Sequence, residues 1–411
     1  MNRRVVFLSL CTTAVLLSAS GICPPAKADL SWWGDSELML TLITFDDAPG
    51  ATEEALITSL GGRVKYTYDL VSTVAAWLSE EAATVLSVDA GVVRIEPDVA
   101  VSALDVELAS SWGVEHIGAG VAHASGNRGT GVKVGIIDSG IDYTHPELVS
   151  SYSGGWDFVN DDSDPRDDYG HGTQVAGIVG AADNDAGIVG VAPEADLYAY
   201  KVFDSLGSGN YSDVIAALDR AIADGIDVVN LSIGSQQDPG QAFQDACDNA
   251  AAAGLLLVAA AGNFGTFDGS GDNIAYPAQY SSVLAVGATM DEEDLRAYFS
   301  STGLELDLMA PGYEIYKTDL FGGYAYEAGT SMAAPFVTGT AALFIHNGVS
   351  AVWDALVSTA IDLGPVGFDT QYGYGLVNAA AAAAVVIPAP SALGLALLGA
   401  VLVRRGRRCS R

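Results

Sequence analysis

Short apolar runs without polar alternation constrain the fold of this chain more than any other feature. The runs are 132–137, 197–203, 226–231, 255–261 and 283–286. Helical patterns such as 211–224 and 242–253 lie between them. Strands that are apolar on both faces and separated by helices indicate a parallel sheet covered on both sides. We therefore predict the α/β class, with a three-layer α/β/α domain built on a mainly parallel sheet.

Residues 37–103 follow a different pattern, which predicts a smaller domain ahead of the α/β domain. The expected order is strand 37–45, helix 52–60, strands 63–70 and 73–78, helix 79–89 and strand 92–96. This βαββαβ order is that of a ferredoxin-like α+β unit.

The first 28 residues are typical of a Sec signal peptide. Arg3 and Arg4 precede the apolar run 5–17, and Ala26-Lys27-Ala28 supplies a small-residue cleavage site. The alternative is a permanent N-terminal anchor, although the apolar run is short for crossing a bilayer.

The last residues of the chain also read as a targeting segment. A Pro-Ala-Pro sequence at 388–390 is followed by the apolar run 391–403 and by the basic cluster 404–408. This pattern is a marginal membrane helix stopped by charges that stay on the cytoplasmic side. It resembles the Pro-Glu-Pro type of C-terminal sorting signal of bacterial exported proteins, with Ala389 in place of the Glu. The alternative is a membrane tail that is never removed.

Composition excludes nucleic acid as a partner and a disulfide scaffold as the source of stability. The chain has 18 Lys and Arg residues against 51 Asp and Glu residues, and its formal net charge is −33. Eight of the basic residues lie in the two end segments, so residues 29–403 hold 10 basic and 51 acidic residues. Such a surface repels phosphates and anionic headgroups. Of the four cysteines, only Cys247 lies between the end segments.

Three residues far apart in the sequence have the chemistry of acyl transfer. Asp138 follows the first strand of the α/β domain, His171 stands between two glycines before a helical segment, and Ser331 precedes the apolar helix expected at 334–345. A Ser hydroxyl becomes a good nucleophile when an imidazole takes its proton, and a carboxylate fixes the tautomer of that imidazole. Singly, each residue also fits a turn, structural or capping role. Together, in the order Asp, His, Ser, they predict a catalytic triad.

The surrounding motifs identify a family. The segments VGIIDSGIDYTHPEL, DDYGHGTQVAGIVG and YEAGTSMAAPFVTGTAAL resemble the three active-site blocks of the subtilisin-like serine peptidases, and the resemblance covers about residues 37–380. It implies that Asp138, His171 and Ser331 form the triad and that Asn263 is the side-chain oxyanion donor. Gln174 and Phe336 stand where many relatives have other residues, commonly His at the former. The rival reading is a catalytically silent scaffold or binding protein with the same fold, at the cell surface.

The resemblance also implies a domain plan. A signal peptide (1–28) precedes an inhibitor-type propeptide (29–104), a peptidase domain (105–380) and a linker with the sorting or membrane tail (381–411). It implies a zymogen that cleaves itself between about residues 102 and 110 and is inhibited by its own propeptide. An extra binding domain is the alternative for the N-terminal unit. We expect a monomeric serine endopeptidase acting on polypeptides, exported from a bacterium to the medium or the cell envelope, with transient or permanent membrane contact through the tail.

The family's substrate strands correspond to 206–210 and 232–234, which pair with an extended peptide. The substrate-binding residues implied are Gly207, Ser208, Gly209, Tyr211, Ser232, Ile233, Gly234, Ala261, Gly262 and Ala275. The pockets are small and apolar, so we predict cleavage after medium apolar or aromatic residues.

Calcium is the expected cofactor, in a structural role. An acidic loop carries Asp157, Asn160, Asp162 and Asp164, and it resembles the calcium loop of thermitase-like members of the family. Glu147 and Asn184 resemble part of the family's tighter calcium site. A further ligand of that site is expected near Leu108, but this chain has no Asp or Gln there. The alternative for both is a solvated acidic loop. The sequence has no zinc spacing and no phosphate-binding loop, so we expect no catalytic metal and no organic cofactor.

Overall fold

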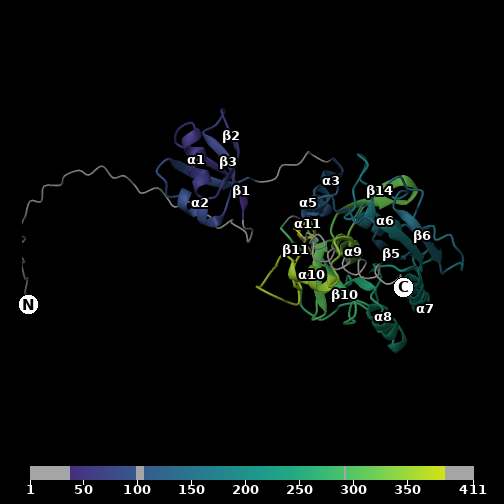
Figure 1. Cartoon of the computed structure of the whole chain (residues 1–411). Helices are drawn as coiled ribbons and strands as arrows, with labels where there is room; N and C mark the ends of the chain where they lie inside the picture. The colour runs from purple at the N-terminus through teal and green to yellow at the C-terminus, as the bar shows by residue number, and fades with distance from the viewer. Residues whose placement is uncertain (1–37, 99–105, 291–292, 385–411) are drawn as a thin grey trace, which may run out of the picture. The chain divides into compact units, whose positions relative to one another are not determined.

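The computed structural model describes residues 38–98, 106–290 and 293–384 of the chain (Figure 1). Two units make up the chain, Met1–Ser102 and Ala103–Arg411. The predicted signal peptide and the apolar part of the C-terminal tail lie outside the described residues. Within those residues, no helix has both the length and the apolar character needed to cross a membrane.

The first unit has the predicted βαββαβ order. Its elements are β1 (Met39–Phe45), α1 (Ala51–Ser59), β2 (Arg63–Thr67), β3 (Thr73–Leu78), α2 (Glu80–Leu86) and β4 (Val92–Pro97). The sheet order is β2-β3-β1-β4, and every neighbouring pair is antiparallel. Ile43, Ile57 and Leu78 are fully buried and join the sheet to its helices. The ferredoxin-like prediction is confirmed for this unit.

The second unit is built on an eight-stranded sheet. Its strands are β5 (Lys133–Asp138), β6 (Tyr152–Asp157), β7 (Asp196–Lys201), β8 (Val228–Leu231), β9 (Leu256–Ala260), β10 (Leu284–Met290), β11 (Leu295–Arg296) and β12 (Leu306–Pro311). The order is β11-β10-β9-β8-β5-β7-β6, and β12 pairs with β10. All pairs are parallel except that of β10 with the two-residue β11. The predicted parallel sheet is therefore confirmed.

Helices cover both faces of this sheet (Figure 1). The helices that the structure describes in this unit are α3 (Val106–Ser110), α4 (Trp112–His116), α5 (Ala119–Ala124), α6 (His171–Gly180), α7 (Tyr211–Asp224), α8 (Gln241–Ala252), α9 (Thr330–His346), α10 (Val352–Ser358) and α11 (Ala381–Ala384). Along β5, Val134 and Ile136 pack into one core with α6 and α9, whereas Ile137 packs into a second core with α7 and α8. Side chains of one strand thus alternate between two cores. The architecture is the predicted three-layer α/β/α arrangement.

A two-stranded hairpin that the sequence did not predict packs on α6. Its strands are β13 (Ile315–Asp319) and β14 (Gly323–Glu327), joined by a short 3-10 turn at Leu320–Gly322. Thr318 Oγ1 donates a hydrogen bond of 2.7 Å to the carbonyl of Thr173 in the first turn of α6. The hairpin therefore fixes the start of this helix.

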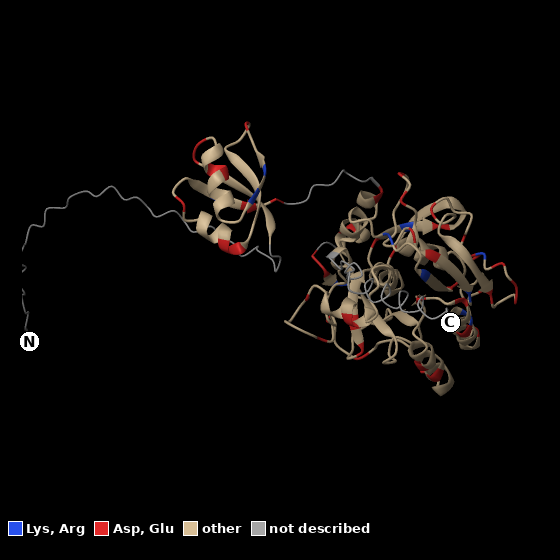
Figure 2. Ribbon diagram, in the orientation of Figure 1, with Lys and Arg blue, Asp and Glu red and all other residues tan. Residues whose placement is uncertain are grey.

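The distribution of charge agrees with the composition, and the cysteine within the described residues, Cys247, is buried. Figure 2 shows acidic positions distributed over helices and loops of both units, with few basic positions among them. Cys247, on α8, is completely buried and unpaired. Burial in the apolar core raises the pKa of the Cys247 thiol to about 12.

Candidate active site

Asp138 and His171 meet at one edge of the sheet. Asp138 is the last residue of β5 and is completely buried, and His171 is the first residue of α6, with an imidazole 23% exposed. His171 Nδ1 lies 2.9 Å from both carboxylate oxygens of Asp138. An ionised carboxylate only accepts hydrogen bonds, so Nδ1 carries the proton and Nε2 is left as the basic nitrogen.

The surroundings of His171 set its basicity. Burial by itself lowers the pKa of His171, but the charge of Asp138 and its hydrogen bond, together with the charge of Asp167, raise the pKa above its usual value. Lys317 acts in the opposite direction and lowers the pKa of His171. The imidazole is therefore a stronger base than a free histidine.

Two polar residues hold the helix start that carries His171. Asp167 Oδ2 accepts hydrogen bonds from the Thr173 amide at 2.9 Å and from Thr173 Oγ1 at 2.6 Å. Ser139 Oγ accepts one from the Gly172 amide at 2.9 Å. First-turn amides of a helix lack partners within the helix, so these contacts satisfy them and orient the turn. The contacts of Asp167 and Ser139 fix the backbone that carries His171, and Asp138 fixes the imidazole ring.

Ser331 is the second residue of α9, which begins at Thr330 and not at residue 334 as predicted. Asn263 follows β9, and its Oδ1 accepts hydrogen bonds from the Thr330 amide at 2.9 Å and from Thr330 Oγ1 at 3.0 Å. A Cβ added to Gly329 would lie 2.9 Å from Ser331 Oγ and 3.4 Å from Asn263 Nδ2. The hydroxyl and the amide donor therefore border the same small space.

The loops that hold these residues leave one edge of the sheet. Asp138 ends β5, and Ser232 and Asn263 follow the neighbouring strands β8 and β9. Ser232 Oγ donates a hydrogen bond of 2.7 Å to the carbonyl of Ser331, and α6 packs directly against α9. In a parallel sheet the carboxyl ends of the strands are where ligand chemistry belongs.

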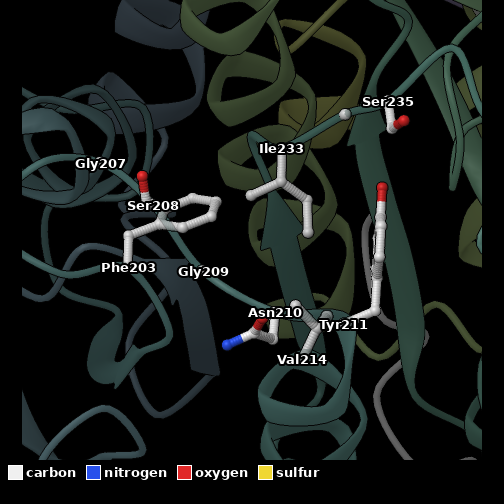
Figure 3. Close-up of a pocket in the computed structure, with 10 residues that line it drawn as sticks. Phe203, Gly207, Ser208, Gly209, Asn210, Tyr211, Val214, Ile233 and Ser235 are labelled. Atoms are coloured by element: carbon white, nitrogen blue, oxygen red, sulfur yellow. The ribbon is translucent and has the colours of Figure 1, made fainter.

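A pocket of about 370 Å³ brings together six of the predicted substrate-binding residues (Figure 3). These are Gly207, Ser208, Gly209, Tyr211, Ile233 and Gly234. Asn210, the last residue of the predicted substrate strand 206–210, also lines it, whereas sequence reasoning missed three further lining residues, which are Phe203, Val214 and Ser235. In Figure 3 the rings of Phe203 and Tyr211 stand on either side of Ile233. A pocket with aromatic walls suits an apolar or aromatic side chain.

The other predicted substrate residues adjoin one another. The Ala275 amide donates a hydrogen bond of 2.7 Å to the carbonyl of Ala261. A Cβ on Gly262 would lie 2.9 Å from the Ala275 methyl group, and one on Gly234 would lie 3.1 Å from it. The residues around Ala275 are therefore small, and larger side chains at these positions would fill the space beside it.

Glu107 joins Glu147 and Asn184, and sequence reasoning missed it. Its carboxylate accepts hydrogen bonds from the Asn184 amide at 3.2 Å and from the Ala186 amide, while Asn184 Nδ2 donates to Glu147 at 3.0 Å. Burial raises the pKa of Glu107, the two amides lower it, and the charges of Asp183 and Glu147 add to the rise. Two buried carboxylates and an amide oxygen are a donor set that suits a hard divalent cation. The signal in the sequence was an acidic residue directly before Leu108.

The predicted acidic loop borders a cavity of about 420 Å³. Asp157, Asn160, Asp162 and Asp164 line it together with Lys201. Asp157 is buried and accepts hydrogen bonds from the Val159 and Asn160 amides, whereas Asp162 and Asp164 are exposed. The oxygen donors suit calcium. Across the described ranges, however, no three His, Cys, Asp or Glu side chains are grouped tightly enough to hold a metal ion.

Comparison with known proteins agrees with the family that the sequence motifs resemble. A family model described as the subtilase family matches residues 129–375. Subtilisin E of Bacillus subtilis is 41% identical over 347 residues, which cover 83% of this chain and 88% of that protein. Subtilisin DY of Bacillus licheniformis is 46% identical over 276 residues, covering 66% of this chain and 98% of that protein. An alkaline protease of Alkalihalobacillus alcalophilus is 40% identical over 319 residues, covering 77% and 80%.

Proposed function

The chain belongs to the subtilase family and is a serine endopeptidase, and on that premise we propose that Asp138, His171 and Ser331 are its catalytic triad. Asn263 is the oxyanion donor. The hydrogen bond of 2.9 Å between His171 Nδ1 and the Asp138 carboxylate is the observation that carries the assignment.

The geometry supports a two-step hydrolysis. Ser331 Oγ attacks the carbonyl carbon of the scissile bond while His171 Nε2 takes the hydroxyl proton. Asn263 Nδ2 and the Ser331 backbone N–H donate to the oxyanion that forms. Collapse of this intermediate breaks the C–N bond, and His171 returns the proton to the leaving amine. Water then releases the acyl group from Ser331 by the same steps.

Ser331 is tested by covalent labelling. We expect a fluorophosphonate probe to label the wild-type protein and not Ser331→Ala, because the probe bonds to the activated hydroxyl. Self-cleavage near residue 105 on expression should be lost in the same variant. Ser212→Ala, which removes an exposed hydroxyl on α7, is the matched control and should label normally. Equal labelling of wild type and Ser331→Ala would falsify Ser331 as the nucleophile.

The rival reading, a catalytically silent scaffold, has no observation in its favour. The three triad positions and Asn263 all carry the residues that the chemistry needs, and Asp138 is oriented toward His171. We therefore keep the peptidase as the single proposed function.

For the N-terminal unit we propose the role of inhibitory propeptide, with cleavage between about residues 102 and 110. The match to Subtilisin E spans 347 residues, which is longer than the second unit, so it extends into the first. A role of this unit in the folding of the second unit is also physically reasonable, because parallel sheets built from segments far apart in the sequence form slowly. The predicted boundaries at 28, 104 and 380 stay proposals.

For substrate we propose an extended polypeptide held along 206–210 and 232–234. The pocket bordered by Phe203, Tyr211 and Ile233 favours apolar side chains. The small residues around Ala275 leave room for a medium apolar or aromatic residue before the scissile bond.

For calcium we propose a structural role at two sites. Glu107, Glu147 and Asn184 would hold one ion, and the acidic loop with Asp157, Asn160, Asp162 and Asp164 would hold a second. Bound calcium would neutralise carboxylates that otherwise repel one another.

For location we propose export through the Sec pathway, followed by release or retention at the cell envelope of a bacterium. The basic and apolar pattern of residues 1–28 supports export. The apolar run 391–403 and the basic cluster 404–408 support contact with the membrane. This contact is transient if the tail is cleaved and permanent if it is kept. We propose a monomer.

A further inference from the structure

The carbonyl group of Ser331 lacks the usual helical donor. A helical carbonyl accepts a hydrogen bond from the amide N–H four residues on, and for Ser331 that residue is Pro335, which lies inside α9 and has no N–H. The proline ring also crowds the carbonyl four residues before it. Ser232 Oγ instead donates a hydrogen bond of 2.7 Å to the Ser331 carbonyl. A side chain from the loop after β8 therefore holds the backbone of the proposed nucleophile.

Ser232 is the first member of a buried polar network, which also contains Asn230 and Thr338. Asn230 Nδ2, on β8, lies 2.8 Å from Ser232 Oγ. Thr338 Oγ1, roughly two turns beyond Ser331 on α9, lies 2.9 Å from Asn230 Oδ1. Asn230 and Thr338 are completely buried, and Ser232 is 7% exposed. The network thus leaves α9 at Thr338, crosses β8 and returns to α9 at Ser331.

The direction of each bond in the network follows from its Ser331 end. A carbonyl oxygen only accepts, so the Ser232 hydroxyl donates its one proton to Ser331. Ser232 Oγ must then accept from Asn230, which turns the amide NH2 group toward Ser232 and leaves Oδ1 facing Thr338. Oδ1 only accepts, so the Thr338 hydroxyl donates to it, and this hydroxyl also lies 3.1 Å from the Ala334 carbonyl. Each contact pairs a donor with an acceptor, and a buried network satisfied in this way specifies one arrangement.

The network joins the nucleophile to the strands that carry the other catalytic groups. Asn230 pairs with Ile136 of β5 and with Val258 of β9. Strand β5 ends in Asp138, and Asn263 follows β9. Ser232 also begins the proposed substrate strand 232–234. The position of Ser331 is therefore fixed against the same part of the sheet that places the acid, the oxyanion donor and the peptide.

We propose that Asn230 and Thr338 are positioning residues, which act through Ser232 to hold Ser331 where its hydroxyl attacks the scissile bond. The inference rests on the proposed function, since it needs Ser331 as the nucleophile. Asn230 and Thr338 touch no reacting atom. A small displacement of a nucleophile slows the chemical step strongly, whereas the pockets that bind the peptide stay in place. Loss of the network should therefore lower kcat and leave KM nearly unchanged.

The test compares two buried threonines of α9. Thr338 Oγ1 and Thr340 Oγ1 each face the carbonyl four residues earlier, at 3.1 Å and 2.8 Å, and Thr338 also donates to Asn230. On a chromogenic peptide anilide, we expect Thr338→Val to lower kcat about tenfold with KM within about twofold of wild type. The rate constant of labelling by the fluorophosphonate probe should fall by a similar factor. Thr338→Ser keeps the hydroxyl and should recover both rates, and Thr340→Val is the matched control and should behave as wild type.

The outcomes separate the inference from the function on which it rests. Unchanged kcat and labelling rate in Thr338→Val overturn the inference, even where the thermal midpoint falls, because a purely structural threonine would behave in this way. An equal loss in Thr340→Val, or a loss that Thr338→Ser does not recover, also overturns it. Thr338→Ala and Thr340→Ala give the same comparison if a valine variant does not fold. Normal labelling of Ser331→Ala by the phosphonate would instead overturn the proposed function itself.

A double-mutant cycle tests whether Thr338 acts through Ser232. The network is already broken in Ser232→Ala, so Thr338→Val should cause no further loss of kcat in that background. Losses that multiply, as they would for independent sites, would contradict the inference.

Discussion

Asp307 is a carboxyl group whose charged form the fold disfavours. It lies on β12, and its Oδ2 accepts a hydrogen bond of 2.8 Å from the Ala285 amide on β10. Burial raises the pKa of Asp307 to about 7, and this hydrogen bond only partly offsets the rise. The folded state therefore binds a proton that the unfolded state has lost, and stability falls as pH rises from about 4 to about 7.

Replacing Asp307 by Asn should remove this pH dependence. We expect Asp307→Asn to raise the thermal midpoint at pH 8, where the wild-type carboxyl is ionised, and to change it little at pH 4. The measurement is thermal unfolding of phosphonate-inactivated enzyme at both pH values. Asp354→Asn, an exposed carboxylate on α10, is the control for net charge. A gain of the same size at pH 4 and pH 8 would contradict the explanation.

At the scale of single residues, the sequence predicts which side chains take part in the chemistry better than it predicts the buried contacts around them. Asp138 and His171 stand in hydrogen-bond contact, as their motifs led us to expect. Glu107 and Lys317 were both missed. Glu107 stands directly before Leu108 but belongs to no motif of its own, and a lysine in a polar segment is normally expected to be exposed, whereas Lys317 is completely buried. Both depend on contacts between segments far apart in the chain.

The packing of β13 on α6 depends on a glycine. Gly177 faces Thr318, and a Cβ there would lie 2.1 Å from Thr318 Oγ1. We expect Gly177→Ala to push the hairpin from the helix and to lower the free energy of unfolding by about 1–3 kcal/mol, as overpacking does. Denaturant unfolding of the inactivated enzyme measures this.

A double-mutant cycle supplies the control for Gly177. Thr318→Ala removes the hydroxyl and the methyl group that the new Cβ would meet, so Gly177→Ala should cost less in that background. Equal costs in both backgrounds would show that the loss comes from elsewhere in α6.

Elements with a strong pattern were the ones that the sequence predicted well. Helix α7 has the predicted bounds, because its apolar stripe and the following Gly225 mark both face and end. Hairpin β13–β14 and strand β6 were missed, since their Tyr, Lys, Gly and Thr residues show no apolar run. Helix α9 begins four residues earlier than its apolar stretch, which places Ser331 inside the first turn.

At the scale of the whole molecule, the excess of acidic charge is the basis of the calcium proposal. We expect an excess of chelator to lower the thermal midpoint of the inactivated mature enzyme, because carboxylates such as Glu107 and Glu147 lose a neutralising ion. Thermal unfolding in calcium and in chelator measures the difference.

Two matched variants assign the effect of calcium to a site. Glu147→Met removes a carboxylate from the buried site, and Asp162→Met removes one from the exposed loop. We expect the difference between calcium and chelator to shrink most in Glu147→Met, since buried charges are screened least by solvent. Equal midpoints in calcium and chelator for the wild type would remove the calcium proposal.

The burial of Cys247 has a practical consequence. If the end segments are removed on maturation, its sulfur is the one thiol left, and it is sealed in the core with its thiolate suppressed. Maleimide reagents should then pass over the native enzyme. A cysteine introduced at any exposed position would be a unique attachment point for a dye or a solid support.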